Sequence, residues 1–362
     1  MRNSLLAGAG VLAVLLAGCG GGDGDDGPEA GPSEAGRVAP LVSATACKAE
    51  DRRSRPNGTR TIWAALDGWD SAETLGNVMA YYRDFYARAN LQVTALSPSG
   101  PAAAIPDVIG RTDEVGVAHG PEVVLAKEKG APIVVVGSLV PESTAAMIWL
   151  ADSGIDGVAD LKGKTIAIPG LYFHKAFLER ILADAGLSID DVKVKSVENA
   201  LVPALTEGKA DAIFGGSGNL EGVELESRGL KPIVTPVRDL GIPDYDELVL
   251  VARPDWTVAN RRSICDLVTA MAHGVRAAAL DTTGAVESLK TSGEANPEIS
   301  RASTRAQIEA TVPLLSKTGY ANPARIERLA DWMYEEGMIE RELPLAALIA
   351  KPDGGESKAA GS

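Results

Sequence analysis

Histidine, cysteine and aromatic residues are scarce in this chain. Its 362 residues include three histidines, three cysteines, 5 Trp, 7 Tyr and 4 Phe. Three cysteines are too few for a disulfide scaffold or a dedicated zinc cluster. Asp and Glu number 49 against 35 Lys and Arg, a net charge of −14, so the basic stripe of a nucleic-acid-binding protein is not expected. The phosphate-binding loop, His-Glu-x-x-His and Gly-x-Ser-x-Gly motifs are also missing, so we expect no enzyme, no metal and no cofactor.

The first 18 residues are typical of a targeting segment. Arg2 supplies a positive charge, and residues 5–17 form an apolar run too short to cross a membrane as a helix. The run ends in Leu16-Ala17-Gly18-Cys19, which resembles the lipobox of bacterial lipoproteins. The resemblance implies that residues 1–18 are removed, that Cys19 carries a lipid, and that the protein is anchored outside the cytoplasmic membrane. The alternative is an ordinary secretory signal followed by an unrelated cysteine.

Two segments contain few apolar residues that could be buried in a core. Residues 19–58 begin with a run of Gly, Asp, Glu, Pro and Ser, which predicts a flexible tether, and residues 351–362 predict a disordered tail. Outside the cytoplasm the remaining thiols, Cys47 and Cys265, can form a disulfide. The alternative is two unpaired thiols, because the sequence does not give their separation.

From residue 59 onward, apolar runs rich in Val, Ile, Leu and Ala alternate with amphipathic helices, and helices dominate after residue 252. Such runs are typical of parallel strands covered on both faces, so the fold class is α/β with open, mostly parallel sheets. Ligands of such sheets bind beyond the carboxyl ends of the strands. We therefore expect the site among the loops at residues 67–74, 97–104, 119–122, 169–175 and 215–222.

Three segments of the body carry a family resemblance. Residues 160–170 (DLKGKTIAIPG), 182–192 (LADAGLSIDDV) and 204–212 (ALTEGKADA) resemble the second lobe of the substrate-binding proteins of ABC importers. These segments are common to the group that binds sulfonates, nitrate, taurine and thiamine pyrimidine precursors. The resemblance extends over about residues 60–340.

Two further segments narrow the resemblance. Residues 219–226 (NLEGVELE) and 237–249 (VRDLGIPDYDELV) are similar to the thiamine-precursor branch, which has an Asn-Trp-Glu-Gly box and a Gly-x-Pro-x-Tyr-x-Glu-Leu segment. The chain departs from that pattern at two places. Leu220 stands where an aromatic residue is usual, and Asp67-Gly68-Trp69 replaces the usual Asp-Trp-Thr, so the stacking surfaces differ.

The resemblance implies a type 2 periplasmic-binding-protein-like fold with two lobes and a cleft. Lobe 1 would comprise residues 59–143 and 247–350, and lobe 2 residues 144–246. The chain would cross near residues 141–146 and return near residues 245–251. Closure by a hinge motion would bury the ligand, and the permease of the importer, with its ATPase, would recognise the closed form. We expect a monomer.

Glu221 is the main candidate ligand residue. A carboxylate at the first turn of a helix is stabilised by the helix N-terminus and can accept two hydrogen bonds from an aminopyrimidine edge. It would repel nitrate or a sulfonate. The alternative is a helix N-terminal Glu without a ligand. Asn219 beside it is either a ligand donor or the N-cap of the same helix.

Three aromatic residues fall in strand-end loops, where a flat ring could stack on a planar heterocycle. They are Trp69, Tyr172 and Phe173. The alternative is packing against the neighbouring lobe, which is the better interpretation for Phe173. In a chain with so few aromatic residues, their position favours a flat ligand.

The remaining candidates are polar. His119 follows a strand and faces the cleft by topology, and His174 is either a ligand contact or a half-exposed residue capping a helix. His273 lies within a C-terminal helix and is expected to be structural. Ser97 and Ser99 can donate hydrogen bonds to a ligand, although Ser-Pro-Ser-Gly is also ordinary turn chemistry.

The leading hypothesis is a lipid-anchored solute-binding protein that delivers a thiamine pyrimidine precursor to an ABC importer. The same role for a flavin, a sulfonate or nitrate is the alternative within this class. An extracytoplasmic enzyme of pyrimidine metabolism is a weaker alternative, because the cysteine-rich motif of related eukaryotic synthases is missing. A surface adhesion or sensor module that has kept the fold is the third.

Overall fold

The computed structural model describes residues 42–51, 58–65, 71–96, 102–198, 200–292 and 300–350. The expected signal peptide, the lipidation residue Cys19 and the expected tail lie outside the described residues, as do Trp69, Ser97 and Ser99. The chain divides into residues 1–37 and residues 38–362, and only the second unit is described below.

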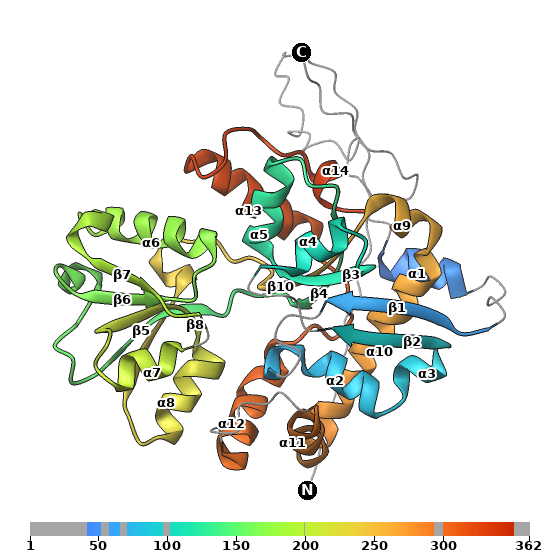
Figure 1. The fold of residues 1–362 in the computed structure, drawn as a ribbon, viewed down its shortest axis with the longest axis horizontal. Helices are drawn as coiled ribbons and strands as arrows, with labels where there is room; N and C mark the ends of the chain where they lie inside the picture. Colours follow the sequence, from blue (N-terminus) through green and yellow to red (C-terminus); the bar gives the residue numbers. More distant parts are fainter. Residues whose placement is uncertain are drawn as a thin grey trace, which may run out of the picture. The chain divides into compact units, whose positions relative to one another are not determined.

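The first sheet has five strands in the order β2-β1-β3-β10-β4 (Figure 1). Strands β1, β2, β3 and β4 run in one direction, and β10 is antiparallel to both of its neighbours. The bounds are β1 Arg60–Ala65, β2 Leu91–Leu96, β3 Val115–His119, β4 Val134–Val140 and β10 Leu248–Ala252.

The second sheet also has five strands, in the order β7-β6-β8-β5-β9. Here β5 is the strand that runs against the others. The bounds are β5 Ala145–Leu150, β6 Thr165–Ile168, β7 Lys193–Ser196, β8 Ala212–Ser217 and β9 Pro232–Pro236. In each sheet the antiparallel strand is the one that the chain enters on arriving from the other sheet, first through residues 141–144 and then through residues 241–247.

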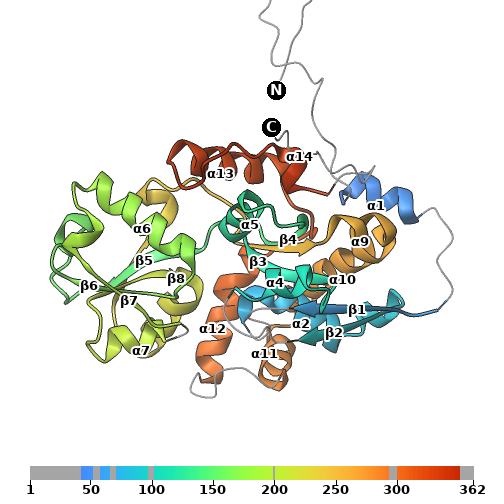
Figure 2. The ribbon, with the colours of Figure 1, turned by 45° about the horizontal axis from the view of Figure 1, so that its top comes forward.

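Helices cover both faces of the first sheet. Along β10, Leu248 and Leu250 face one core cluster and Val249 and Val251 face another, as the two-residue period of a strand requires. The first cluster packs under α2 and α10, and the second under α4, α5 and α13, which lies beside α5 (Figure 2). The bounds of the helices of this half are α1 Ala44–Asp51, η1 Ala72–Thr74, α2 Leu75–Tyr82, α3 Phe85–Arg88, α4 Ala104–Ile109, α5 Gly120–Glu128, α9 Pro254–Ala259, α10 Arg261–Leu280, α11 Thr282–Thr291, α12 Arg301–Thr311, η6 Val312–Leu314, α13 Pro323–Glu335 and α14 Leu345–Leu348.

The second sheet is covered in the same way. Phe177 and Ile181 of α6 pack on one face, and Leu201 of α7 and Leu225 of α8 on the other. The bounds are η2 Val158–Leu161, α6 Tyr172–Asp184, η3 Ile189–Asp191, α7 Leu201–Thr206, η4 Gly218–Gly222, α8 Val223–Ser227 and η5 Val237–Leu240. The predicted α/β fold class, with most strands of each sheet running one way, is confirmed.

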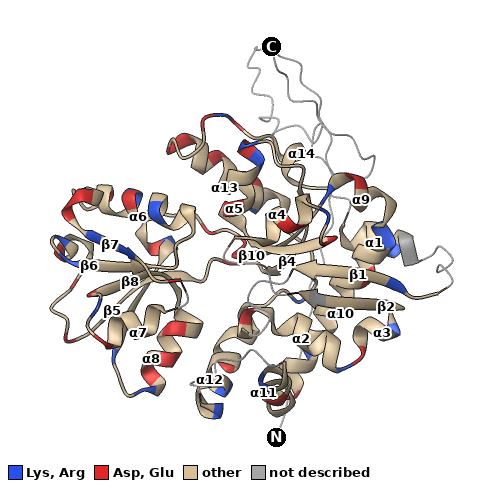
Figure 3. Cartoon of the chain, viewed as in Figure 1, with Lys and Arg blue, Asp and Glu red and all other residues tan. Residues whose placement is uncertain are grey.

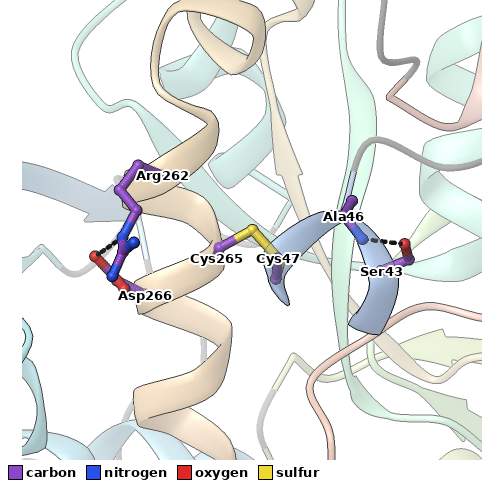
Figure 4. The surroundings of a disulfide bond; sticks show 6 residues. All are labelled: Ser43, Ala46, Cys47, Arg262, Cys265 and Asp266. Atoms are coloured by element: carbon purple, nitrogen blue, oxygen red, sulfur yellow. Dashed lines mark hydrogen bonds and ion pairs between the residues drawn. A yellow bond between two sulfur atoms is a disulfide. The ribbon is translucent and has the colours of Figure 1, made fainter. Parts of the chain in front are cut away.

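A disulfide joins α1 to α10. The sulfur atoms of Cys47 and Cys265 are 2.01 Å apart, and both residues are buried (Figure 4). On α10, Arg262 lies about one turn before Cys265 and forms an ion pair of 2.9 Å with Asp266, the residue after Cys265. Of the two alternatives that the sequence left open for these thiols, the structure has the paired one.

Candidate functional site

Polar side chains from both halves meet where β3 and β8 end. His119 is the last residue of β3, and Asn219 and Glu221 lie in the π-helical turn η4, directly after β8. Glu73 comes from η1, and Glu247 directly precedes β10. His119 and the turn η4 therefore lie at the carboxyl ends of β3 and β8, the edge at which ligands of α/β sheets bind.

Asn219 does not cap a helix. Its Nδ2 donates to Oε1 of Glu73 at 3.1 Å and to Oγ1 of Thr311 at 2.9 Å. The N-cap of η4 is Ser217, whose side chain makes no capping hydrogen bond. The expectation that Asn219 is the N-cap is wrong, because both amide donors are used by residues of the other half.

Glu247 connects the two segments that pass between the sheets. Its Oε2 accepts from the backbone N–H of Thr144 at 2.9 Å and of Ala145 at 3.1 Å, and its Oε1 lies 2.9 Å from Nδ1 of His119. Burial alone would raise the pKa of Glu247, but the contact with His119 and the two backbone donors hold it below its ordinary value. An ionised Glu247 orients His119 with its Nδ1 proton toward the carboxylate.

Glu221 is partly buried and folds back on the end of β8. Its Oε2 accepts from the backbone N–H of Ser217 at 2.6 Å. Burial raises its pKa to about 7 against the lowering effect of the backbone donors, and the nearby Glu73 and Glu224 add to the rise. At neutral pH this carboxyl is therefore divided between its protonated and ionised forms.

Glu73 is the third carboxylate of the site and is buried. Burial raises its pKa, Glu247 raises it further, and hydrogen bonds from Asn219 and Thr144 offset part of the rise. Among the described residues, no Lys or Arg forms an ion pair with Glu73, Glu221 or Glu247. Figure 3 shows further acidic residues on α8, which follows η4 directly. The electrostatics of the site favour N–H donors and cations and disfavour anions.

The aromatic candidates on α6 point in different directions. Tyr172 is 85% exposed, and Nζ of Lys129 lies 5.8 Å from its ring centre. Phe173 is completely buried, and its ring centre lies 5.5 Å from those of both His119 and Phe177. The structure thus places Phe173 in the core beside the site and Tyr172 on the surface.

His174 packs tightly on Phe173, with ring centres 4.0 Å apart. It is 2% exposed, and Leu171 rather than His174 is the N-cap of α6, so the expectation of a half-exposed capping histidine is wrong. Burial lowers its pKa to about 3, with a further contribution from His119, and the ring is therefore neutral. Its Nδ1 makes no hydrogen bond with the part of the chain that the structure describes.

The structure adds residues that the sequence interpretation did not single out. Glu73, Thr144, Thr311 and Glu247 all contribute side-chain hydrogen bonds to the site. Glu247 carries a detectable signal, since it is an acid at the edge of a continuous apolar strand. Glu73 lies in the loop at residues 67–74, where the sequence predicts part of the site, but no local pattern distinguishes it, and Thr311 carries no signal on its amphipathic helix.

Two features are absent from the described residues. None of the helices there combines the length and the apolar character needed to cross a bilayer. No group of three or more His, Cys, Asp or Glu residues within those ranges could hold a metal ion. His273 lies on α10, away from the site, and its ring packs edge-on against Phe85 with centres 5.6 Å apart.

The chain has sequence relatives in several organisms. A thiamine biosynthesis protein of Haemophilus influenzae is 27% identical over 77% of this chain and 88% of its own length. A formylaminopyrimidine-binding protein of Halalkalibacterium halodurans is 29% identical over 53% of this chain and 58% of its own length. A 4-amino-5-hydroxymethyl-2-methylpyrimidine phosphate synthase of Schizosaccharomyces pombe is 30% identical, over 44% of this chain and 46% of its own length.

Solved structures share the fold. The periplasmic aliphatic sulphonate binding protein SsuA of Escherichia coli superposes with a TM-score of 0.63 at 17% identity, covering 81% of this chain and 98% of its own. This likeness confirms the expected two-lobed periplasmic-binding-protein fold. A family model described as "NMT1/THI5 like" matches residues 71–284. The chain belongs to the NMT1/THI5-like family.

Proposed function

We propose that this protein is the solute-binding component of an ABC importer and that its ligand is an aminopyrimidine-like precursor of thiamine. The observation that carries the proposal is the set of carboxylates Glu73, Glu221 and Glu247, which have no Lys or Arg partner among the described residues. The names of the relatives from Haemophilus influenzae and Halalkalibacterium halodurans support the same ligand class.

An aminopyrimidine matches this site chemically. Its exocyclic amine and an adjacent protonated ring nitrogen can donate two parallel hydrogen bonds to one carboxylate. A group with a pKa of about 7, as Glu221 has, can share one proton with a weakly basic ring at neutral pH. We assign this contact to Glu221, with His119 at the end of β3 as a second polar contact. The candidates Trp69, Ser97 and Ser99 remain proposals from the sequence.

A sulfonate or nitrate would be a poor ligand for the same site. An anion placed between these carboxylates forms no ion pair. It is repelled by their negative charges, and its burial also costs the free energy of its lost hydration. A flavin has a flat ring with N–H donors and remains the alternative within the class. The panel described below separates these ligands.

We propose a binding protein rather than an enzyme, although relatives such as the Schizosaccharomyces pombe protein are named synthases. Both cysteines of the body, Cys47 and Cys265, are engaged in the disulfide and are unavailable as nucleophiles or metal ligands. The body would act by closing on its ligand and presenting the closed form to the permease and its ATPase.

The location and the domain boundaries belong to the same proposal. The disulfide fits an oxidising compartment outside the cytoplasm, and the Leu-Ala-Gly-Cys sequence ending at Cys19 supplies the lipid anchor. Residues 1–18 would be the signal peptide and 351–362 the tail. Residues 19–58 would be the tether, although α1 within this range is held to α10 by the disulfide. Residues 59–143 and 247–350 would form lobe 1, and residues 144–246 lobe 2, in a monomer.

A thermal-shift screen of the purified chain tests the proposal. The panel comprises aminopyrimidines, flavins, alkanesulfonates and nitrate. A ligand at 100 times its dissociation constant should stabilise the protein by about 2.7 kcal/mol. Stabilisation by aminopyrimidines alone supports the proposal, and stabilisation by the anions alone refutes it.

A further inference from the structure

A set of hydrogen bonds connects the two halves away from the segments that pass between the sheets. Besides the bonds from Asn219 to Glu73 and Thr311, Nε2 of Gln307 donates to the carbonyl oxygen of Leu220 at 3.2 Å. At the far end of the same contact, the hydroxyls of Ser227 and Ser303 are 2.9 Å apart. All of these bonds join η4 and α8 to η1 and α12.

The two sides of this contact belong to different cores. On one side, Leu225 of α8 is part of the cluster beneath the second sheet. On the other, Ala72 of η1 and Ile308 of α12 are part of a cluster beneath the first sheet. Asn219 is 146 residues from Glu73 and 92 from Thr311 in sequence. These separations show that the contact is a tertiary one, and Leu220 of η4 also packs against the cluster beneath the first sheet.

Asn219 is central to this contact. It is 8% exposed, and its partners Glu73 and Thr311 are 6% and 0% exposed, so the bonds are shielded from water. The carboxamide has two N–H donors, and each meets a different partner. A buried carboxylate that loses a donor keeps its desolvation cost, so closing without Asn219 is unfavourable.

We propose that Asn219 is the latch of the closed form, holding the second half against η1 and α12 by donating to both Glu73 and Thr311. Asn219 is then a positioning residue rather than a ligand contact. A closed form that is already populated binds its ligand with a smaller conformational cost. The proposal does not depend on the identity of the ligand.

Hydrogen exchange of the ligand-free, full-length chain tests this proposal. In Asn219→Ala, amides of residues 218–227 and 301–311 should exchange about tenfold faster than in the wild type, because two buried hydrogen bonds are lost. Amides of the strand cores should keep their rates. Glu226→Gln is the matched control, since Glu226 is exposed on α8 and should change neither segment.

A double variant that exchanges the hydrogen-bond donor and acceptor tests whether the bond between residues 219 and 73 itself holds the contact. Asn219→Asp places a carboxylate against Glu73 and should open the contact at least as much as Asn219→Ala. In the double variant Glu73→Gln with Asn219→Asp, the donor and the acceptor exchange roles, and exchange should return toward the wild-type rate. The proposal fails if Asn219→Ala exchanges like the wild type, if faster exchange spreads evenly over both sheets, or if the double variant is no slower than Asn219→Asp alone.

Discussion

Replacing Glu221 with Gln should stabilise the protein above neutral pH. A carboxyl whose pKa is higher in the folded state than in the unfolded state favours folding in its protonated form. Its contribution is fully present at low pH and is lost as the pH rises from 4.5, the ordinary value, to about 7. That difference in pKa corresponds to at most about 3 kcal/mol. The Gln oxygen still accepts the backbone N–H of Ser217, so the substitution removes the charge and keeps the hydrogen bond.

Urea unfolding of the wild type and Glu221→Gln at pH 4.5, 6 and 8 measures this effect. The free energies of unfolding of the two proteins should nearly coincide at pH 4.5. At pH 8 the free energy of unfolding of the variant should exceed that of the wild type by up to about 3 kcal/mol. The exposed neighbour Glu226 gives the control, because Glu226→Gln should stay within about 0.5 kcal/mol of the wild type throughout. A gap that does not change with pH, or a variant less stable at pH 8, would refute the assigned environment of Glu221.

Three other variants test further features of the structure. Replacing Cys47 and Cys265 together with Ser should lower the free energy of unfolding by about 2–4 kcal/mol, and urea titration of the oxidised wild type and the variant should show it. Gly215→Ala should cost about 1–3 kcal/mol in the same assay, because Gly215 has a φ of +86° and a Cβ there would lie 2.6 Å from Nε2 of His174. Tyr172→Ala should leave ligand affinity within about twofold, since Tyr172 is 85% exposed, and a larger loss in a binding titration would place it in the site.

The α/β fold class can be predicted from the sequence because the strands are marked by continuous apolar runs. The run at residues 248–252 is apolar at every position, and β10 is buried on both faces, as such runs predict. The return to the first sheet was likewise placed close to its observed position. The resemblance of residues 160–170 and 204–212 supplied the two-lobed arrangement, which composition alone would not give.

The candidate site can be predicted only in part, because its hydrogen bonds join residues that are far apart in the sequence. Asn219 stands out in the sequence because it lies beside Glu221, but its partner Glu73 lies 146 residues away, and no local pattern connects them. Tyr172 and Phe173 are adjacent in sequence, and only the position of the first turn of α6 decides which one enters the core. Local pattern thus finds elements and strand ends, whereas the pairing of buried polar groups depends on tertiary packing.

Isothermal titration calorimetry with an aminopyrimidine precursor of thiamine tests the central claim most directly. The wild type should bind it, and Glu221→Gln should bind at least tenfold more weakly, a loss of about 1.4 kcal/mol, while Glu226→Gln binds as the wild type does. Nitrate and an alkanesulfonate should give no binding heat. Equal affinity in the wild type and Glu221→Gln, or binding of the sulfonate in place of the aminopyrimidine, would contradict the account.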